Sequence, residues 1–382
     1  KVMWKATQNI IERRPLSGVG AGAWEVDIPL YQAEGSQLET DYYAHNEVLQ
    51  ILGEYGLVGW LFMLLLVGYS LTAAWRTLAA RSEDAMNEGP IRAVALTSLL
   101  ALMVVSNIGF PWRLASTGVI FALCLGLLAA SDARLGLRGV LASSRLPWRP
   151  AFSQIAAVAT MACLVLATYI TQQAAECEAK IVQAVKLALS ISQSGDPLNP
   201  KHDKAKKEML KLAREGIAIN PHYRKITPML GDELAKWGDW KNATWVWESV
   251  VGSRPYVVAM MSNIARGHAA MGNVPKALEF LERAKKIQPK AISVRSLEVI
   301  LLSRSGKETQ ALALARQAFA DNTLDIDMMN AAYVLAVRAN DFKFAVQSMA
   351  VRNTVYPDQK VDGLLKMVPV EFNFAKNEAG AL

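Results

Sequence analysis

The run LVGWLFMLLLVGYSLTAAW, residues 57–75, contains no charged side chain. Three later stretches share this property, at residues 93–112, 114–131 and 150–175. A helix needs about 20 apolar residues to cross the hydrocarbon core of a bilayer, and buried helices of soluble proteins rarely run so far without a charge. Four such stretches in succession predict four transmembrane helices between residues 57 and 175.

Basic residues predict the orientation of these helices. Residues 76–92 carry three arginines and residues 131–149 carry four, whereas the short hairpin at residues 110–113 carries one. Cytoplasmic loops are enriched in Lys and Arg, so the two arginine-rich loops are expected inside the cell. Residues 1–56, which we expect to form a loop, then lie in the periplasm of a Gram-negative bacterium, beside its inner membrane. The hairpin and the region after residue 176 are expected on the same side. The seven arginines are Arg76, Arg81, Arg92, Arg134, Arg138, Arg145 and Arg149.

A period of 34 residues runs through the C-terminal region. The turn-forming residues Gly238, Gly272, Gly306 and Asn340 have this spacing. An alanine follows each of them by five residues, and Pro221, Pro255, Pro289 and Pro357 fall on the same grid, with Thr323 in the remaining slot. This pattern resembles the tetratricopeptide repeat. It predicts a helical solenoid over residues 176–382, so that the whole chain is expected to be all-α.

A helical solenoid presents a concave face, which favours a protein partner for the repeat region. A purely structural lid on the membrane domain is the alternative. Four tryptophans crowd the first clear repeat, and core packing together with membrane contact explains them better than a sugar-binding platform. They are Trp237, Trp240, Trp245 and Trp247.

Composition narrows the class of protein. Hydrophobic residues make up 52% of the 382 residues, and the net charge is +7. The basic residues form no stripe interleaved with aromatic residues, so a nucleic acid is not expected as a partner. The spacing of the three cysteines suggests neither a metal site nor a disulfide framework. The positive charge favours anionic glycans or lipid headgroups.

Residues 15–22, PLSGVGAG, form a glycine-rich stretch. A dinucleotide fingerprint would need a strand before it, and residues 12–17 do not read as a buried strand. We expect a loop whose backbone approaches a ligand or another helix closely. A loop whose N–H groups cradle a phosphate is the alternative.

His45 lies in the stretch AHNEVLQ, residues 44–50, shortly before the first apolar run. A histidine near a helix start commonly serves as a capping or hydrogen-bonding residue. At the expected boundary of water and lipid, however, an imidazole can also accept a proton near neutral pH. His45 is therefore a candidate catalytic residue. His202, His222 and His268 are scattered over the repeat region and form no metal-binding pattern.

The stretches PLSGVGAG (15–22), AHNEVLQ (44–50) and EYGLVG (54–59) together resemble the O-antigen ligase and polymerase superfamily. The resemblance covers roughly residues 1–131 and implies the C-terminal portion of a polytopic inner-membrane domain. Members of this superfamily with C-terminal tetratricopeptide repeats are familiar. The chain begins in mid-pattern, so we expect that a larger protein precedes residue 1 and that residues 1–382 alone lack part of the donor pocket.

The resemblance implies an inverting glycosyl transfer that needs no metal or cofactor. The donor would be a glycan on undecaprenyl pyrophosphate, and the acceptor a hydroxyl of a glycan, of lipid A-core or of a protein. His45 matches the catalytic histidine expected in the family, where it would activate the acceptor hydroxyl. Departure of the pyrophosphate calls for fixed positive charge and N–H donors. The candidate donor contacts are Arg113, Arg14, Gly18, Gly20 and Gly22.

The sequence leaves the step of glycan assembly open, because ligases, polymerases and protein-glycosylating transferases share the histidine-containing loop. A protein of a different class is also compatible with the pattern. A membrane-anchored repeat protein could serve as a scaffold for envelope or export machinery without catalysing a reaction.

Overall fold

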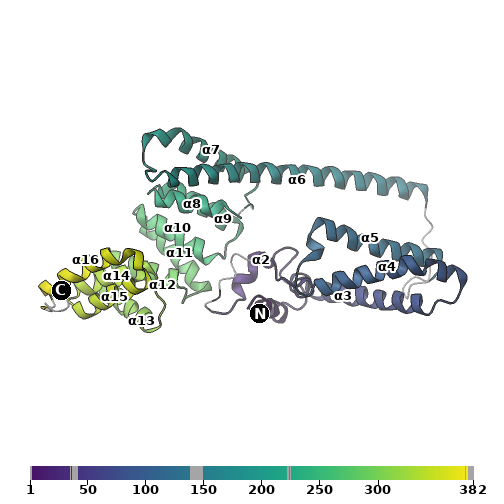
Figure 1. Ribbon diagram of the computed structural model, residues 1–382, viewed down its shortest axis with the longest axis horizontal. Helices are drawn as coiled ribbons and strands as arrows, with labels where there is room; N and C mark the ends of the chain where they lie inside the picture. Colours follow the sequence, from purple (N-terminus) through teal and green to yellow (C-terminus); the bar gives the residue numbers. More distant parts are fainter. Residues whose placement is uncertain are drawn as a thin grey trace. The chain divides into compact units, whose positions relative to one another are not determined.

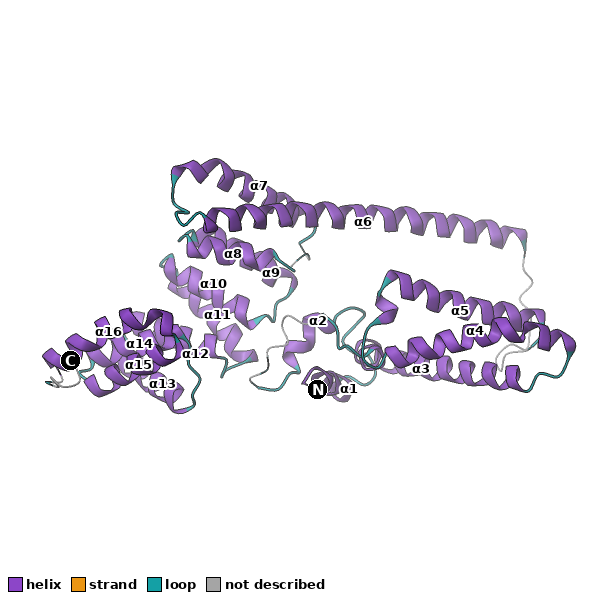
Figure 2. Cartoon of the chain, in the orientation of Figure 1, coloured by secondary structure: helices purple, strands orange, loops and turns teal. Residues whose placement is uncertain are grey.

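The computed structural model describes residues 2–34, 36, 42–137, 149–221, 223, 225–374 and 376. The regular structure in these ranges is entirely helical, which confirms the all-α prediction (Figures 1 and 2). The chain divides into two compact units, Lys1–Val165 and Leu166–Leu382. Arg138 and Arg145 of the second arginine-rich loop lie outside the described residues.

The first unit contains a short N-terminal helical region and three long helices. Its elements are α1 (Val2–Arg13), α2 (Trp24–Asp27), η1 (Ile28–Leu30), α3 (Glu47–Leu78), α4 (Glu83–Val105), η2 (Pro111–Arg113) and α5 (Ala115–Arg134). Residues 1–56, predicted as a loop, thus include two helices and the start of a third. Helices α4 and α5 pack through a small core formed by Ala95, Leu99, Cys124 and Leu128.

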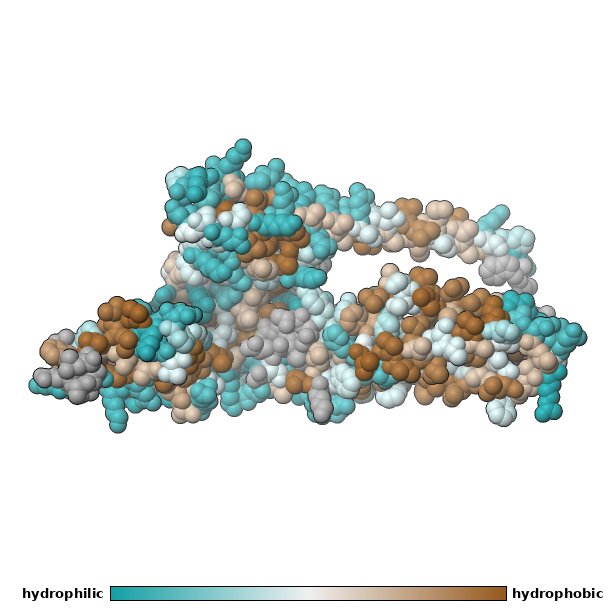
Figure 3. Space-filling model, viewed as in Figure 1, coloured by the Kyte–Doolittle hydropathy of each residue, from teal (hydrophilic) through white to brown (hydrophobic). Residues whose placement is uncertain are grey.

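Four helices of the described chain are long and apolar enough to cross a membrane. They are α3, α4, α5 and α6 (Pro150–Gln193). Most of their apolar side chains face away from the protein, and apolar surface gathers over α3 to α5 in Figure 3. Such surface is stable in lipid but prone to association in water. The predicted second span, residues 93–112, is wrong at its end, because α4 stops at Val105 and a turn and a 3₁₀ segment follow.

Helix α3 contains a kink at Gly56, whose φ of 53° and ψ of −127° are not helical. The backbone N–H of Leu57 donates to the carbonyl of Leu16 (3.0 Å), which lies outside the helix. Added bulk is excluded at the kink, since a Cβ on Gly56 would lie 2.5 Å from the Leu16 carbonyl oxygen. The kink separates the polar first part of α3 from the apolar run that begins at Leu57.

Helix α6 changes character along its length. None of the side chains in its membrane-capable window is buried within the protein. Its C-terminal part, from Cys177 to Ile191, instead contributes buried side chains to the core of the second unit. There Lys180 forms an ion pair with Glu215 of α7 (Asp203–Ile219) at 2.7 Å. One helix therefore serves first as an apolar span and then as a packing element of the repeat region.

The second unit continues as antiparallel helical hairpins. The hairpins are α8 (Thr227–Lys236) with α9 (Trp240–Ser253), α10 (Val258–Ala270) with α11 (Val274–Ile287), α12 (Ile292–Arg304) with α13 (Glu308–Ala320), and α14 (Ile326–Arg338) with α15 (Phe342–Val355). The unit ends with η4 (Pro357–Gln359), α16 (Lys360–Pro369) and a π-helical turn, Val370–Phe374.

The 34-residue pattern marks the turns and the close helix contacts of the hairpins, as the sequence predicted. Gly238, Gly272, Gly306 and Asn340 all have positive φ and turn the chain between the two helices of a hairpin. The alanine five residues later is fully buried in each repeat, which allows the two helices to approach closely. The four alanines are Ala243, Ala277, Ala311 and Ala345.

The tryptophans of the first repeat serve mainly as packing residues. Trp237 and Trp247 are buried, and their indole N–H groups donate to Ser192 Oγ (2.8 Å) and Asp232 Oδ1 (3.2 Å). Trp240 and Trp245 are partly buried against the same core. The predicted core packing is confirmed for the two buried rings, which are not available for stacking on a sugar.

Candidate active site

His45 lies immediately before α3 in a backbone conformation that few residues adopt. Its φ is 51°, in the left-handed region, where histidine is tolerated better than most non-glycine residues. Asn46, not His45, caps the helix, because its side chain accepts the N–H of Leu49 (3.0 Å). His45 is exposed, and its ring meets the edge of Phe110 with the centroids 5.1 Å apart.

Hydrogen bonds fix the backbone on both sides of His45. The Ala44 carbonyl accepts the indole N–H of Trp4 (2.9 Å), and the Ala44 N–H donates to Gln50 Oε1 (3.0 Å). On the other side, the Glu47 N–H donates to the carbonyl of Ser106 (2.8 Å). The exposed imidazole is therefore presented from a rigid backbone, as a positioned base requires.

Arg113 lies between two carboxylates. Its Nε donates to Glu47 Oε2 and its Nη2 to Glu54 Oε2, each at 3.1 Å. Both carboxylates are buried, with side chains only 1% exposed, whereas 23% of the Arg113 side chain is exposed. Burial disfavours the charged form of Arg113, but Glu54 and Glu47 outweigh it and raise the pKa of the guanidinium.

This cluster changes the role expected for Arg113. Two carboxylates already compensate its charge, so it is a weak site for a further anion. Its guanidinium also lies 5.6 Å from the ring centroid of Tyr43, which stacks against Phe110. Arg113 thus joins the hairpin after α4 to the start of α3 and to the segment that carries His45. A positioning role fits these contacts better than the predicted contact with phosphate.

The glycine-rich stretch packs its backbone against the kink of α3. The N–H groups of Val19 and Gly20 donate to the carbonyls of Gly53 and Glu54, each at 2.9 Å. A Cβ on Gly18, which has a φ of 62°, would lie 2.3 Å from the Glu54 carbonyl oxygen. This is the close approach to another helix that the sequence favoured. The N–H groups of Gly18 and Gly20 are bonded within the protein and cannot cradle a phosphate.

Arg14 and Gly22 remain exposed at the ends of this loop. Arg14 acts on Asp27 of α2, where burial raises the pKa of the carboxyl group and the positive charge of Arg14 partly offsets the rise. Gly22 has open space around its Cα. Among the predicted donor contacts, these two keep surfaces that a ligand can reach.

A groove lined by polar and apolar residues lies beside Arg113. It has a volume of about 510 Å³. Glu47, Tyr55 and Arg113 form its polar part, and apolar side chains of α3, η2 and α5 form the remainder. The apolar and small residues are Ile51, Val58, Gly59, Phe62, Trp112 and Phe121. Its shape and polarity suit an amphiphile with a polar head and a hydrocarbon chain.

Sequence reasoning missed the carboxylates of this site. Glu47, Gln50 and Glu54 recur at intervals of three and four residues, so the start of α3 carries them on one face. Gln50 Nε2 donates to Glu54 Oε1 (3.0 Å) and links the face into one network. Carboxylates at helical spacing beside an apolar run were the feature of the sequence that could have identified them. Over the residues described, no group of three or more His, Cys, Asp or Glu side chains is arranged to hold a metal ion.

Tetratricopeptide repeat proteins are among the solved structures that are similar to part of this chain. A tetratricopeptide protein of Thermus thermophilus has 16% identity and a TM-score of 0.38, over 50% of this chain and 97% of its own. One from Parabacteroides merdae has 11% identity and a TM-score of 0.38, over 53% and 76%. The pilF protein of Pseudomonas aeruginosa has 15% identity and a TM-score of 0.38, over 54% and 88%.

No curated protein has a sequence that matches this chain. The N-terminal region does match a family model, described as O-Antigen ligase, over residues 1–64. The matched region contains the glycine-rich stretch, His45 and the three polar residues at the start of α3. The first 64 residues are therefore similar to the O-antigen ligase family, which confirms the resemblance predicted from their motifs.

Proposed function

We propose that this chain takes part in a ligase-type glycosyl transfer from a lipid-linked glycan at the periplasmic face of the inner membrane. The observation that carries the proposal is the position of His45. It lies inside the region similar to O-antigen ligases, and it is exposed from a fixed backbone just before a membrane-capable helix.

The chemistry proposed for His45 is that of a general base. A neutral imidazole nitrogen takes the proton of an acceptor hydroxyl, and the hydroxyl oxygen attacks the anomeric carbon of the donor sugar. The new C–O bond forms as the bond from the anomeric carbon to the pyrophosphate oxygen breaks on the opposite face, so the configuration inverts. The lipid pyrophosphate leaves with the bonding electron pair, and the imidazolium returns its proton to water.

The groove beside Arg113 supports a lipid-linked donor. Its apolar walls suit a polyprenyl chain, and one of its polar lining residues, Glu47, opens the first turn of α3, which His45 precedes. Arg113 is compensated by Glu47 and Glu54, so the charge that stabilises the leaving pyrophosphate is assigned to other groups, Arg14 among them. The resemblance leaves the acceptor open among a glycan, lipid A-core and protein.

The test replaces His45 in the bacterium that carries the gene. Asparagine is the suitable substitute, because it tolerates positive φ and retains polarity but cannot act as a base. We expect His45→Asn to abolish attachment of the glycan at wild-type protein level. Gel analysis of lipopolysaccharide and of lipid-linked glycan then identifies the step. Long polymer retained on its lipid carrier indicates a ligase, and single capped repeats indicate a polymerase.

His202→Asn is the matched control. His202 lies in the repeat region, where its Nε2 is 3.0 Å from Ser194 Oγ, and it is expected to leave both glycan profiles unchanged. If neither profile changes in His45→Asn, glycoproteins are examined next. Unchanged glycosylation of proteins as well would remove the catalytic role of His45.

A groove of the repeat region favours the second candidate function, that of a docking scaffold. It has a volume of about 570 Å³ and is lined by residues of α12 and α14, including Arg304, Asp327 and Asn330. Asn330 Oδ1 is buried without a hydrogen-bond partner among the described residues. A bound chain could supply the missing donor. A scaffold predicts that Asn330→Ala impairs glycan assembly or export while His45→Asn does not.

A further inference from the structure

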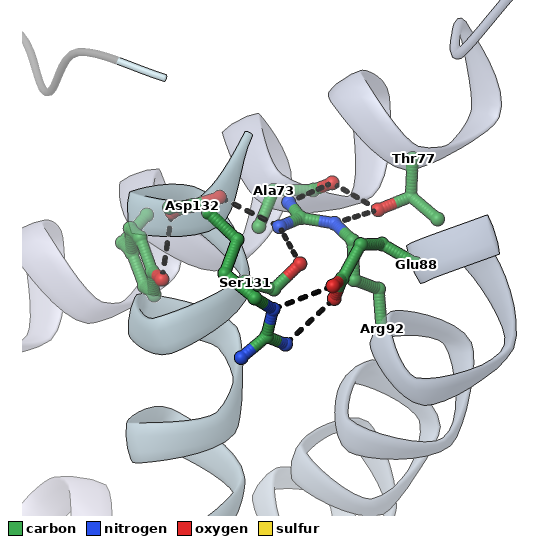
Figure 4. A network of polar contacts seen from close by, with 8 residues as sticks. Ala73, Thr77, Glu88, Arg92, Ser131 and Asp132 are labelled. Carbon is green, nitrogen blue, oxygen red and sulfur yellow. Dashed lines mark hydrogen bonds and ion pairs between the residues drawn. The ribbon is translucent and has the colours of Figure 1, made fainter. Parts of the chain in front are cut away.

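A buried arginine joins the three long helices of the first unit at the end away from His45. Arg92 of α4 is 2% exposed. Its guanidinium donates to Asp132 Oδ1 (2.6 Å), Ser131 Oγ (3.1 Å) and Thr77 Oγ1 (2.9 Å), as Figure 4 shows. Asp132 also accepts the hydroxyl of Tyr69 (3.0 Å). The network fixes the ends of α3, α4 and α5 relative to one another.

A pocket of about 290 Å³ adjoins this network. Three of the residues that line it are arginines (Arg76, Arg81 and Arg92) and none is acidic. Thr77 and Ser82 add hydroxyl groups. Glu83 and Asp84, in the first turn of α4, do not line the pocket. Arg92 is compensated by Asp132, which does not line the pocket, so Arg76 and Arg81 provide the charge there. Guanidinium groups with hydroxyl groups beside them suit the binding of a phosphate group.

Part of the pocket lining is apolar. Trp75, whose side chain is 72% exposed, lines the pocket from the end of α3, and Leu135 and Leu137 line it after α5. Tryptophan at the end of a membrane-capable helix is typical of the water–lipid boundary. A phosphate site that also has apolar lining residues at this level suits the headgroup of a phospholipid better than a soluble anion.

We propose that this pocket binds the phosphate of an anionic phospholipid, with Arg81 and Arg76 as the charged contacts and Arg92 as a fixed wall. The arginine-rich loops predict that this end faces the cytoplasm, and the cytoplasmic leaflet is rich in anionic lipids. The bound headgroup holds the turn between α3 and α4 at the membrane surface. The proposal concerns the opposite end of the helices from His45 and does not depend on the glycosyl transfer.

The test measures the melting temperature of the purified full chain in a neutral detergent. Phosphatidylglycerol is added in one series, phosphatidylcholine in a second and inorganic phosphate in a third. We expect phosphatidylglycerol to raise the melting temperature on the order of 3 °C, because a ligand of the native state stabilises it. Phosphatidylcholine and inorganic phosphate are expected to raise it much less.

Three variants separate the effect of the pocket from that of general surface charge. Arg81→Gln removes a pocket arginine from an exposed turn and should lose most of the shift, whereas Arg81→Lys should keep part of it. Arg149→Gln removes the same charge from an exposed residue that does not line the pocket, and it should keep the full shift. Equal losses in Arg81→Gln and Arg149→Gln would overturn the proposal. So would equal shifts with the two phospholipids, and an equal shift with inorganic phosphate would exclude the lipid as the ligand.

Discussion

At the residue scale, the backbone and the side chain of His45 differ in their surroundings. Asn46, Gln50 and Glu47 make the hydrogen bonds that hold the segment, and the imidazole is left at the surface beside Phe110. A non-glycine residue with positive φ carries a backbone cost of roughly 1–2 kcal/mol. A histidine whose side chain served no purpose here could be replaced by glycine with a gain in stability. Strain of this kind is common at functional sites.

The role of Arg113 can be resolved by a pair of substitutions. Arg113→Gln leaves two buried carboxylates without their counter-charge and should destabilise the protein by about 3 kcal/mol, near the lower limit for buried pairs because Arg113 is partly exposed. Adding Glu54→Gln should recover much of the stability, since one of the two uncompensated charges is then removed. Thermal unfolding in detergent measures both effects.

Transfer activity decides between the two interpretations of Arg113. If this residue positions the His45 segment, the double variant recovers activity together with stability. If it contacts the pyrophosphate, the double variant is stable but inactive. Wild-type stability in Arg113→Gln alone would show that the ion pairs contribute little.

At the element scale, the glycine-rich loop and the kink of α3 pack directly against each other. Gly18→Ala places a Cβ 2.3 Å from the Glu54 carbonyl oxygen, and Gly56→Ala places one 2.5 Å from the Leu16 carbonyl oxygen. Both residues also have positive φ. Each substitution should cost at least about 1–3 kcal/mol and lower glycan transfer, because the loop supports the start of α3. Thermal unfolding in detergent measures the cost. Gly68→Ala of α3, which has open space around it, should leave the melting temperature unchanged or raise it.

Helix packing in the repeat region depends on another glycine. A Cβ on Gly267 of α10 would lie 2.1 Å from Thr244 Oγ1 of α9. We expect Gly267→Ala to lower the free energy of unfolding by about 1–3 kcal/mol, as overpacked cores do. Adding Thr244→Ala removes the crowded hydroxyl and should restore much of the loss. Circular dichroism of the full chain measures this, with Gly252→Ala of α9 as the control in open space. Additive losses in the double variant would contradict the close contact.

For the whole molecule, the features with a period or a long uniform run were predictable from the sequence. The apolar runs led to the membrane-capable helices, and the 34-residue spacing led to the turns at Gly238 and Asn340. The ion pairs of Arg113 were not predictable, because they join residues 59 and 66 positions apart. The end of α4 at Val105 was missed as well, since the stretch without charged residues continues through the turn that follows.

The orientation of the whole molecule governs every functional proposal, because a lipid-linked glycan is presented at the periplasmic face. Labelling of single introduced cysteines can report the orientation. The exposed Cys163 is first replaced by serine, whereas Cys124 and Cys177 can stay because they are buried. Leu16→Cys and Asp196→Cys are separated by four membrane-capable helices, and Ala79→Cys and Asp196→Cys by three. If all four helices cross, an even number returns the chain to the same side and an odd number does not.

A membrane-impermeant maleimide applied to spheroplasts should therefore label Leu16→Cys and Asp196→Cys directly. Ala79→Cys should react only after the membrane is permeabilised, because the arginine-rich loops are expected in the cytoplasm. The reverse pattern would place His45 in the cytoplasm and would exclude transfer at the periplasmic face. Labelling of all three sites in intact spheroplasts would mean that α3, the helix between residues 16 and 79, does not cross, and that one of the three helices between residues 79 and 196 does not cross either. Since no side chain in the apolar window of α6 is buried within the protein, α6 requires lipid around it, and α4 or α5 would then be the second helix to reassign.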